Sequence, residues 1–347
     1  MQHWKEGGHD KLCKKIKKAG GAEQYNANKK YSEAVAVAAQ ACAEDTKGQK
    51  CYICTEAVHR HTGEGLVRGC ACHTTEGFVH VSCLAEQAKI LVAEAVENKL
   101  GGKVLGERFG RWHTCSLCEQ GYYGVVYCAL GWACWKMYLG RPETYGLRIS
   151  AMRQLGSGLH AAQHYGDALS VRETELSTWR LGDSEHNILI AQHNLATTYS
   201  SLGRAEESLR MRRDVYAGRL RRNGEKDVVT IVAAQNYATC LAGLQRFEEA
   251  KSVSRTTLPV ARRVLGESDD LTLRIRWTYA MTLYRDPVAT LDDLRLAVTM
   301  LEDLERTARR VLGATHPLAS GIEKSQRDAR AALGAELKAA ASGGRLS

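Results

Sequence analysis

Proline and aromatic residues are scarce in this sequence. Its 347 residues include 4 prolines, and aromatic residues make up 7% of the chain. Alanine, leucine, arginine and glutamate are abundant instead. Because proline interrupts helices and these four residues favour them, the composition predicts a largely helical protein.

Motifs of independent catalysis are also missing. The sequence contains no GxxxxGK[ST] phosphate loop, no HExxH helix and no nucleophile elbow, so we expect no catalytic pocket that works on its own. The formal net charge of +9 is spread along the expected helices. Aromatic residues do not alternate with the basic ones, and we therefore expect no nucleic-acid partner.

An apolar signal segment is lacking, since residues 1–18 are polar and basic. The 12 cysteines are placed too unevenly for a secreted disulfide framework, which predicts a reducing, intracellular location, cytoplasmic or nuclear. One apolar run, Tyr122–Leu139, is nearly long enough to cross a membrane. Its interruption by Lys136 and glycines, and the repeats that follow, favour a buried helix, so a membrane partner is not expected.

Four pairs of cysteine and histidine residues form the main motif. The pairs are Cys51-x2-Cys54, Cys70-x-Cys72, His80-x2-Cys83 and Cys115-x2-Cys118. Seven cysteines and one histidine supply the eight ligands that two tetrahedral zinc ions need. The spacing predicts zinc binding, through which a module with a small core is held together.

The order of these ligands resembles the RING-CH (RING-variant) zinc finger, most clearly in VRGCACHTTEGFVHVSCL and WHTCSLCEQ. A PHD finger shares the ligand order, but its spacing fits less well. The resemblance implies a cross-brace, in which the pairs alternate between two zinc ions. One ion is then held by Cys51, Cys54, His80 and Cys83. The other is held by Cys70, Cys72, Cys115 and Cys118.

The same resemblance implies an activity. Proteins of this family dock a ubiquitin-conjugating enzyme and orient its ubiquitin for attack by a substrate lysine, without a nucleophile of their own. Ile53, beside the second cysteine, and Trp112, ahead of the seventh ligand, stand where RING families place docking residues. Packing of Trp112 over the second zinc site is the alternative for that residue.

Two departures from the family pattern leave a second function open. Residues 84–111 lengthen the interval between the sixth and seventh ligands, and Leu84–Leu100 predicts a helix that Gly101 and Gly102 end. Glu119 follows the eighth ligand, where many active members carry a basic residue that donates hydrogen bonds to ubiquitin. The alternative to a ubiquitin ligase is thus a non-enzymatic adaptor.

The first 50 residues contain a predicted helix over Lys30–Glu44, on which Cys42 is expected to be a core residue. Ahead of it, Trp4, His9 and Cys13 resemble the last third of a MYND zinc finger. The other ligands of that finger are missing, so we expect no metal there. A short basic helix with an incidental histidine and cysteine is the equal alternative.

A period of 42 residues follows the zinc motif. Asn194–Thr198 matches Asn236–Cys240 and then Thr278–Thr282. Each unit predicts two helices, which resembles the kinesin-light-chain type of tetratricopeptide repeat. Roughly four stacked units then form one continuous core. Small residues at matched positions, where paired helices are expected to cross closely, are Ala196, Ala238 and Ala280.

The repeat resemblance implies a concave face that binds a protein or peptide substrate. Asn194 and Asn236 offer a donor and an acceptor to a peptide backbone, although they also suit turns inside the array. The full set of polar candidates on the first helices is Gln192, Asn194, Gln235, Asn236 and Arg276.

The predicted fold is mostly α, with a small two-zinc cross-brace RING-like module and an α-solenoid. The predicted segments are an N-terminal helix with the MYND-like remnant (1–50), the zinc module (51–120), an apolar connecting helix (121–140), the repeat array (141–333) and a flexible tail (334–347).

Overall fold

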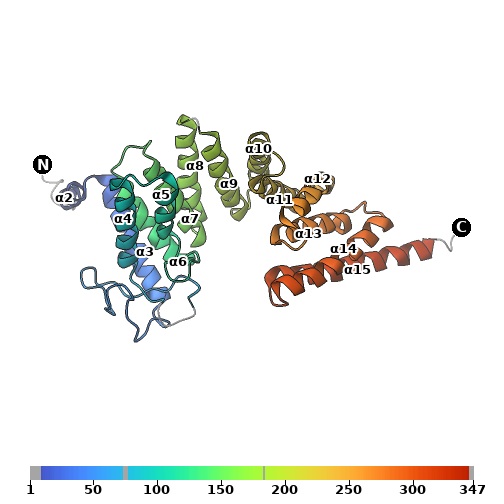
Figure 1. Cartoon of the computed structure of the whole chain (residues 1–347), viewed down its shortest axis with the longest axis horizontal. Coiled ribbons are helices and arrows are strands. Elements are labelled where there is room, and N and C mark those ends of the chain that lie inside the picture. Colours follow the sequence, from blue (N-terminus) through green and yellow to red (C-terminus); the bar gives the residue numbers. More distant parts are fainter. Residues whose placement is uncertain (1–8, 73–76, 183, 344–347) are drawn as a thin grey trace. The chain divides into compact units, whose positions relative to one another are not determined.

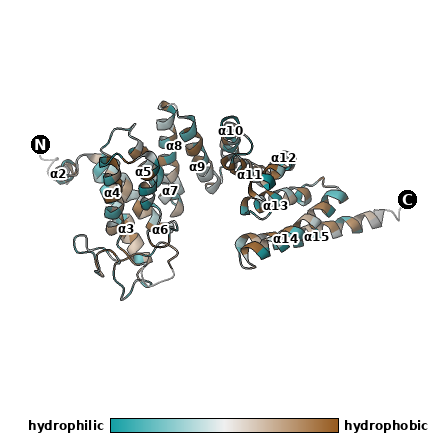
Figure 2. Cartoon of the chain, viewed as in Figure 1, coloured by the Kyte–Doolittle hydropathy of each residue, from teal (hydrophilic) through white to brown (hydrophobic). Residues whose placement is uncertain are grey.

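Helices form almost all of the regular structure of this chain (Figure 1). The computed structural model describes residues 9–72, 77–182 and 184–343. Within those residues there is no β-strand, and the isolated antiparallel bridges are Val67–Val79 and Thr114–Gly121. Hydrophilic and hydrophobic residues alternate along helices such as α14 (Leu291–Leu312), as in amphipathic helices (Figure 2). The prediction of a mostly α fold is confirmed.

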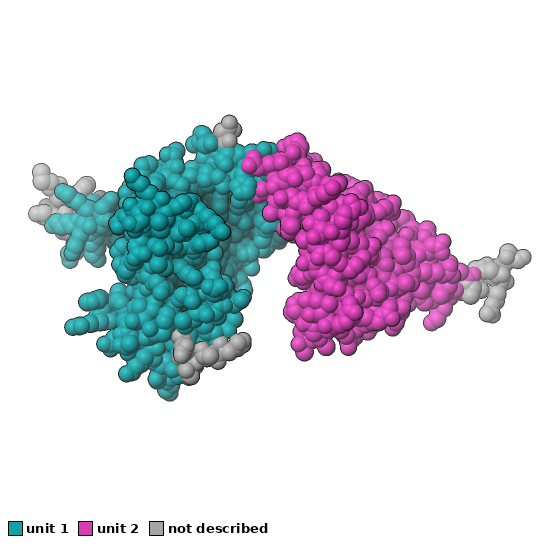
Figure 3. Space-filling view, viewed as in Figure 1, with its two compact units in different colours: residues 1–202 teal, residues 203–347 magenta. Residues whose placement is uncertain are grey.

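The chain divides into two compact units, residues 1–202 and residues 203–347 (Figure 3). The division falls inside the predicted repeat array. The predicted domain boundaries at residues 50, 120 and 140 stay predictions. The helices of the first unit are α2 (His9–Ala19), α3 (Ala22–Ala41), α4 (Val81–Glu97), α5 (Gly102–Phe109), the 3-10 turn η1 (Gly110–Trp112), α6 (Gly124–Tyr138), α7 (Gly146–Ala161), α8 (Tyr165–Leu181) and α9 (Glu185–Ser201).

Helix α6 is the central helix of the first unit and contacts α3, α4 and α7. Leu130 and Cys134 are fully buried, which confirms the prediction of a buried helix for this apolar run. A Cβ atom on Gly158 of α7 would lie 2.7 Å from the Tyr127 carbonyl oxygen. Glycine therefore permits the close crossing of α6 and α7. No helix among the described residues combines the length and the apolar character needed to cross a membrane.

The cysteine-rich loops pack on the same core. Val35 and Ala38 of α3 belong to one buried cluster with Leu66 and Val67 of the loop and with Val126 of α6. Cys42 is also buried in this cluster, as predicted. The loops thus pack on α3, which precedes the predicted zinc module in the sequence, and on α6, which follows it.

The segment between the sixth and seventh cysteine or histidine ligands forms α4 and α5. Helix α4 ends at Glu97, and Lys99 then takes a left-handed φ of 50° before Gly101 precedes α5. The helix predicted at Leu84–Leu100 is present, displaced by three residues at each end. Sequence periodicity located the helix, but its capping residue is Asn98 rather than a glycine.

The second unit consists of helical hairpins with repeated turn chemistry. Helices α10, α12 and α14 end at Gly224, Gly266 and Gly313, which have φ angles of 79°, 96° and 90°. Asp227 and Asp269 each cap the helix that follows, by accepting a backbone N–H at 2.9 Å. The helices are α10 (Ala205–Asn223), α11 (Val228–Gly243), α12 (Phe247–Leu265), α13 (Asp270–Arg285), α14 and α15 (Pro317–Gly343).

Matched alanines are buried in the repeats, as their spacing predicts. Ala196 and Ala280 are 0% exposed and Ala238 is 1% exposed. A small side chain at each position leaves room for the neighbouring helix.

A buried ion pair links two hairpins of the second unit. The Lys251 ammonium lies 2.7 Å from the Asp286 carboxylate, and both side chains are buried. The Lys251 ammonium also lies 2.8 Å from the exposed Glu248. Hydrogen bonding to Lys251 holds the pKa of Asp286 below its ordinary value. The pair therefore stabilises the fold above a pH of about 4 and loses this effect as the pH falls through the lowered pKa.

We predict that Asp286→Asn lowers the free energy of unfolding. The loss stays below the roughly 3–5 kcal/mol typical of a broken buried pair, because Glu248 remains beside Lys251. Chemical denaturation at neutral pH measures the loss, which shrinks as the pH falls below about 4 and on through the lowered pKa of Asp286. Asp292→Asn, at a side chain that is 91% exposed and pairs with the exposed Arg295, is the control and costs less than about 1 kcal/mol. Equal denaturation midpoints for Asp286→Asn and the unaltered chain would contradict the prediction.

Candidate metal centre

Cys51 and Cys54 lie in a tight turn whose backbone closes around the first sulfur. The Ile53 and Cys54 amides donate to Cys51 Sγ at 3.4 and 3.5 Å. The Thr55 amide donates to the Cys51 carbonyl at 2.9 Å, and Thr55 adopts a left-handed φ of 63°. Both sulfurs can therefore bind a single metal ion from one side of the turn.

Cys115 and Cys118 lie in a turn of the same form. The Leu117 amide donates to Cys115 Sγ at 3.4 Å, and the Glu119 amide donates to the Cys115 carbonyl at 3.0 Å. Glu119 has a φ of 55°, matching Thr55 of the first turn. Two segments distant in the sequence thus adopt one metal-binding geometry.

The first group of candidate ligands is Cys51, Cys54, His80 and Cys83. Their ligand atoms all lie within 4.8 Å of one another. His80 Nδ1 is 3.3 Å from Cys54 Sγ and 3.7 Å from Cys83 Sγ. A tetrahedral zinc ion with bonds of about 2.3 Å to sulfur and 2.0 Å to nitrogen places such atoms about 3.5 Å apart. The spacing of this group fits the ion.

The second group is Cys70, Cys72, Cys115 and Cys118, again with all sulfurs within 4.8 Å. Cys72 Sγ and Cys115 Sγ are 3.8 Å apart. Tetrahedral Zn–S bonds of about 2.3 Å place two sulfurs about 3.8 Å apart, so this group fits the ion as well. The two Cys/His clusters, as we call these groups, could each hold a metal ion.

The two clusters interleave along the chain. The second cluster begins at Cys70, between the halves of the first, and ends beyond it at Cys118. The structure thus brings together the same two sets of four residues that the RING-CH resemblance implies. The described residues contain no further group of three or more cysteine, histidine or acidic side chains close enough to hold a metal ion.

Helix α4 presents Cys83, and Glu64 fixes the start of this helix. The Glu64 carboxylate accepts hydrogen bonds from the Ser82 amide at 2.7 Å and from the Ser82 hydroxyl at 2.9 Å. Tyr31 of α3 contacts the same hydroxyl at 3.2 Å. A carboxylate at a helix N-terminus satisfies free amides and interacts well with the helix dipole. Sequence reasoning missed Glu64, because no local spacing links it to Ser82.

The thiols differ in how readily they ionise. Burial raises the pKa of Cys70 to about 11 and also raises the pKa of Cys83. At Cys51 burial acts in the same direction, but hydrogen bonds from backbone groups outweigh it and lower the pKa. Burial lowers the pKa of His80, which favours the neutral imidazole. Since a metal binds thiolates and neutral imidazole, its binding releases protons and strengthens as the pH rises.

Ile53 projects from the Cys51–Cys54 turn, which we call the first metal turn, into an apolar groove along α4. The groove has a volume of about 640 Å³, and its lining includes Ile90, Leu91 and His59. Ile53 is 38% exposed and Ile90 is 49% exposed. The structure therefore places Ile53 where a partner could contact it.

Trp112 does not have the exposed position that a docking residue needs. Its side chain is 0% exposed and packs in a cluster with Ala88 and Val92 of α4 and Ala133 of α6. The Gln154 side-chain amide of α7 donates to the Trp112 carbonyl at 2.9 Å. The docking prediction for Trp112 is wrong because α4, α6 and α7 cover it, and packing is its role.

The N-terminal residues form a helix rather than a metal site in the described part. Cys13 is exposed on α2 and belongs to neither cluster. Trp4 and the side chain of His9 lie outside the described residues. The MYND-like remnant stays a prediction.

The predicted groove residues of the repeats have different positions. Asn194 and Asn236 are half-buried, and their peptide-binding role stays a prediction. Gln235 is buried, and its amide donates to Thr278 Oγ1 at 2.8 Å. Arg276 is buried and lies 2.6 Å from Asp303. For Gln235 and Arg276 the groove prediction is wrong, because both residues join helices inside the second unit.

Comparison with known proteins identifies the repeats. Residues 188–227 match the family model described as a tetratricopeptide repeat. No curated protein matches the chain. The match supports the prediction of tetratricopeptide repeats, and repeats of this kind serve as protein-interaction scaffolds. The bounds of the array stay a prediction.

Solved structures give weaker likenesses. A putative kinesin light chain with TPR-like repeats from Podosopora anserina is 13% identical, with a TM-score of 0.47, over 67% of this chain and 97% of that one. BtubC (BKLC) from P. vanneervenii is 14% identical, with a TM-score of 0.41, over 76% of this chain and 92% of BtubC. Likeness at these scores carries no inference about partners, and the kinesin-light-chain subtype stays a prediction.

We predict that the purified full chain binds two zinc ions, measured by mass spectrometry of the metal content. Cys51→Ser and Cys70→Ser each remove one ligand from a different cluster, so each variant retains at most one ion. Cys240→Ser alters a cysteine outside both clusters and retains two. One zinc ion or none in the unaltered chain, or two in either ligand variant, would contradict the prediction.

Proposed function

We propose that this chain is a zinc-stabilised, intracellular RING-type ubiquitin ligase whose tetratricopeptide repeats select the substrate. The observation that carries the proposal is the pair of interleaved Cys/His clusters with Ile53 exposed beside the first of them. Neither cluster supplies a nucleophile, so the proposed role is to position a ubiquitin-conjugating enzyme that already carries ubiquitin.

Zinc is the metal that best suits the two clusters. Tetrahedral groups of thiolate and imidazole ligands select zinc among the common divalent metals. With all four positions taken by protein ligands, the ion has a structural role and cross-links the loops. The proposed ligands are Cys51, Cys54, His80 and Cys83 for one ion, and Cys70, Cys72, Cys115 and Cys118 for the other.

The groove between the first metal turn and α4 is the proposed docking surface. Ile53 enters it from the turn, while Ile90 and Leu91 line it from the helix. Partly exposed aliphatic side chains that meet in one groove are typical of protein contacts. Because Cys83 belongs to both α4 and the first cluster, loss of that metal ion would move the two walls apart.

Glu119 supports the second candidate function, a non-enzymatic adaptor. Its carboxylate is 77% exposed and lies 3.7 Å from the Arg111 guanidinium, which also donates to the Cys115 carbonyl at 3.3 Å. A carboxylate cannot donate hydrogen bonds to ubiquitin, and Arg111 already has these two acceptors. In an adaptor the metal clusters would only hold the loops in place.

The proposal predicts ubiquitin transfer by the zinc-loaded full chain. With ubiquitin, activating enzyme and a panel of conjugating enzymes, we expect chains to form with at least one of them. Cys51→Ser and Ile53→Ala each lower the rate at least fivefold, because the first removes a metal ligand and the second an apolar contact worth roughly 1–2 kcal/mol.

Val264→Ala is the matched control for Ile53→Ala. Val264 is 38% exposed, like Ile53, but it lies on α12 of the second unit, so its loss leaves the rate unchanged. Absence of transfer with every conjugating enzyme, from a chain shown to hold two zinc ions, overturns the ligase in favour of the adaptor.

A further inference from the structure

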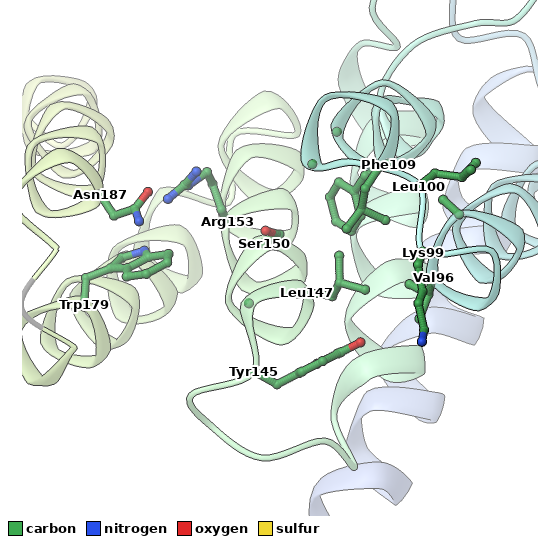
Figure 4. Close-up of a pocket in the computed structure, with 15 residues that line it drawn as sticks. Val96, Lys99, Leu100, Phe109, Tyr145, Leu147, Ser150, Arg153, Trp179 and Asn187 are labelled. Atoms are coloured by element: carbon green, nitrogen blue, oxygen red, sulfur yellow. The ribbon is translucent and has the colours of Figure 1, made fainter.

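A second large pocket lies in the first unit, on the inserted helices α4 and α5. It has a volume of about 630 Å³, within the range of specific binding pockets. Its other walls come from α7 and from the hairpin of α8 and α9 (Figure 4). The insertion between the metal ligands thus builds one side of a pocket whose opposite side is a helical hairpin.

The walls near α5 and α7 are apolar. Phe109 of α5 faces Leu147 and Tyr145, which lie at the start of α7 (Figure 4). Leu105 of α5 also lines the pocket. All four side chains are half-buried: they pack on the core of the unit and keep one side towards the pocket. Such a surface favours a large aliphatic or aromatic side chain.

The charged groups in the lining are both cationic. Lys99 stands at the end of α4 and Arg153 projects from α7, and no aspartate or glutamate is among the described lining residues. Arg153 Nε donates to the buried Glu175 at 2.7 Å, while its Nη2 atom is buried without a partner. The Arg153 guanidinium also lies 5.9 Å from the Trp179 ring.

Glu175 does not neutralise Arg153 alone. Burial lowers the pKa of the buried Arg172 to about 10, although the same Glu175 carboxylate acts to raise it. One carboxylate therefore serves two guanidinium groups, and a net positive charge remains beside the pocket. Arg153 Nη2 and Glu175 Oε2 are both buried without a partner, so the cationic groups open to a ligand are the exposed Lys99 and the part of the Arg153 side chain that is 28% exposed.

We propose that this pocket binds a protein segment in which a large apolar side chain stands next to acidic residues. The apolar walls take the side chain, while Arg153 and Lys99 attract the carboxylates. Val96 and Lys99 are exposed at the pocket. The site is thus open to an extended segment and does not have to enclose a small molecule. The inference does not depend on ubiquitin transfer.

The test uses fluorescein-labelled Gly-Asp-Asp-Trp-Asp-Asp-Gly and fluorescence anisotropy with the full zinc-loaded chain. We expect saturable binding that weakens at least tenfold when lysines replace the aspartates or alanine replaces the tryptophan. Val96→Glu and Lys99→Glu each weaken binding at least tenfold, because they add a negative charge at the pocket. Both residues are exposed, so circular dichroism and zinc content stay unchanged in the two variants.

Val229→Glu is the matched control, since Val96 and Val229 are both 45% exposed and Val229 lies in the second unit. It leaves peptide binding unchanged. The proposal is overturned by an absence of saturable binding up to 1 mM peptide, by equal binding of the aspartate and lysine peptides, or by full binding in Val96→Glu. If free N-acetyltryptophan binds as tightly as the peptide, the pocket is a small-molecule site and the protein segment is ruled out.

Discussion

The convergence of eight ligand atoms into two groups is the constraint on which the first unit depends. Between α3 and α4 the described chain has one isolated bridge and tight turns but no strand or helix of its own. Two turns of equal geometry, at Cys51 and at Cys115, orient their sulfurs by backbone N–H groups. Each proposed metal ion then joins segments that local hydrogen bonds alone leave unconnected, so metal binding and folding are coupled.

Helical packing supports this arrangement from outside. The loops share a buried core with α3 and α6, and Glu64 fixes the start of α4, which carries Cys83. Helix α4 therefore has three roles: it presents a metal ligand, lines the Ile53 groove and lines the pocket near Arg153. A partner bound at either surface thus contacts the helix that completes the first cluster. In the second unit, by contrast, repeated glycine and aspartate turns and buried alanines hold the hairpins together.

Short-range patterns in the sequence were sufficient for much of this description. Two cysteines three residues apart already predict a metal-binding turn. A 42-residue period likewise locates the matched alanines and the helix ends. Long-range packing could not be predicted from local sequence patterns. Trp112 is covered by α4, α6 and α7, and Gln235 bonds to Thr278 on the next hairpin; neither contact has a signature in local spacing. The pocket near Arg153 was missed for the same reason, because its walls come from five helices.

The central claim concerns the ligands of the two metal ions, and X-ray absorption at the zinc edge measures them directly in the full chain. Seven sulfurs and one nitrogen shared by two ions predict an average shell of 3.5 sulfurs and 0.5 nitrogen per zinc, from the two clusters of four. The expected Zn–S distance is about 2.3 Å. A shell with two or fewer sulfurs per zinc, filled instead by oxygen or nitrogen, would contradict the account.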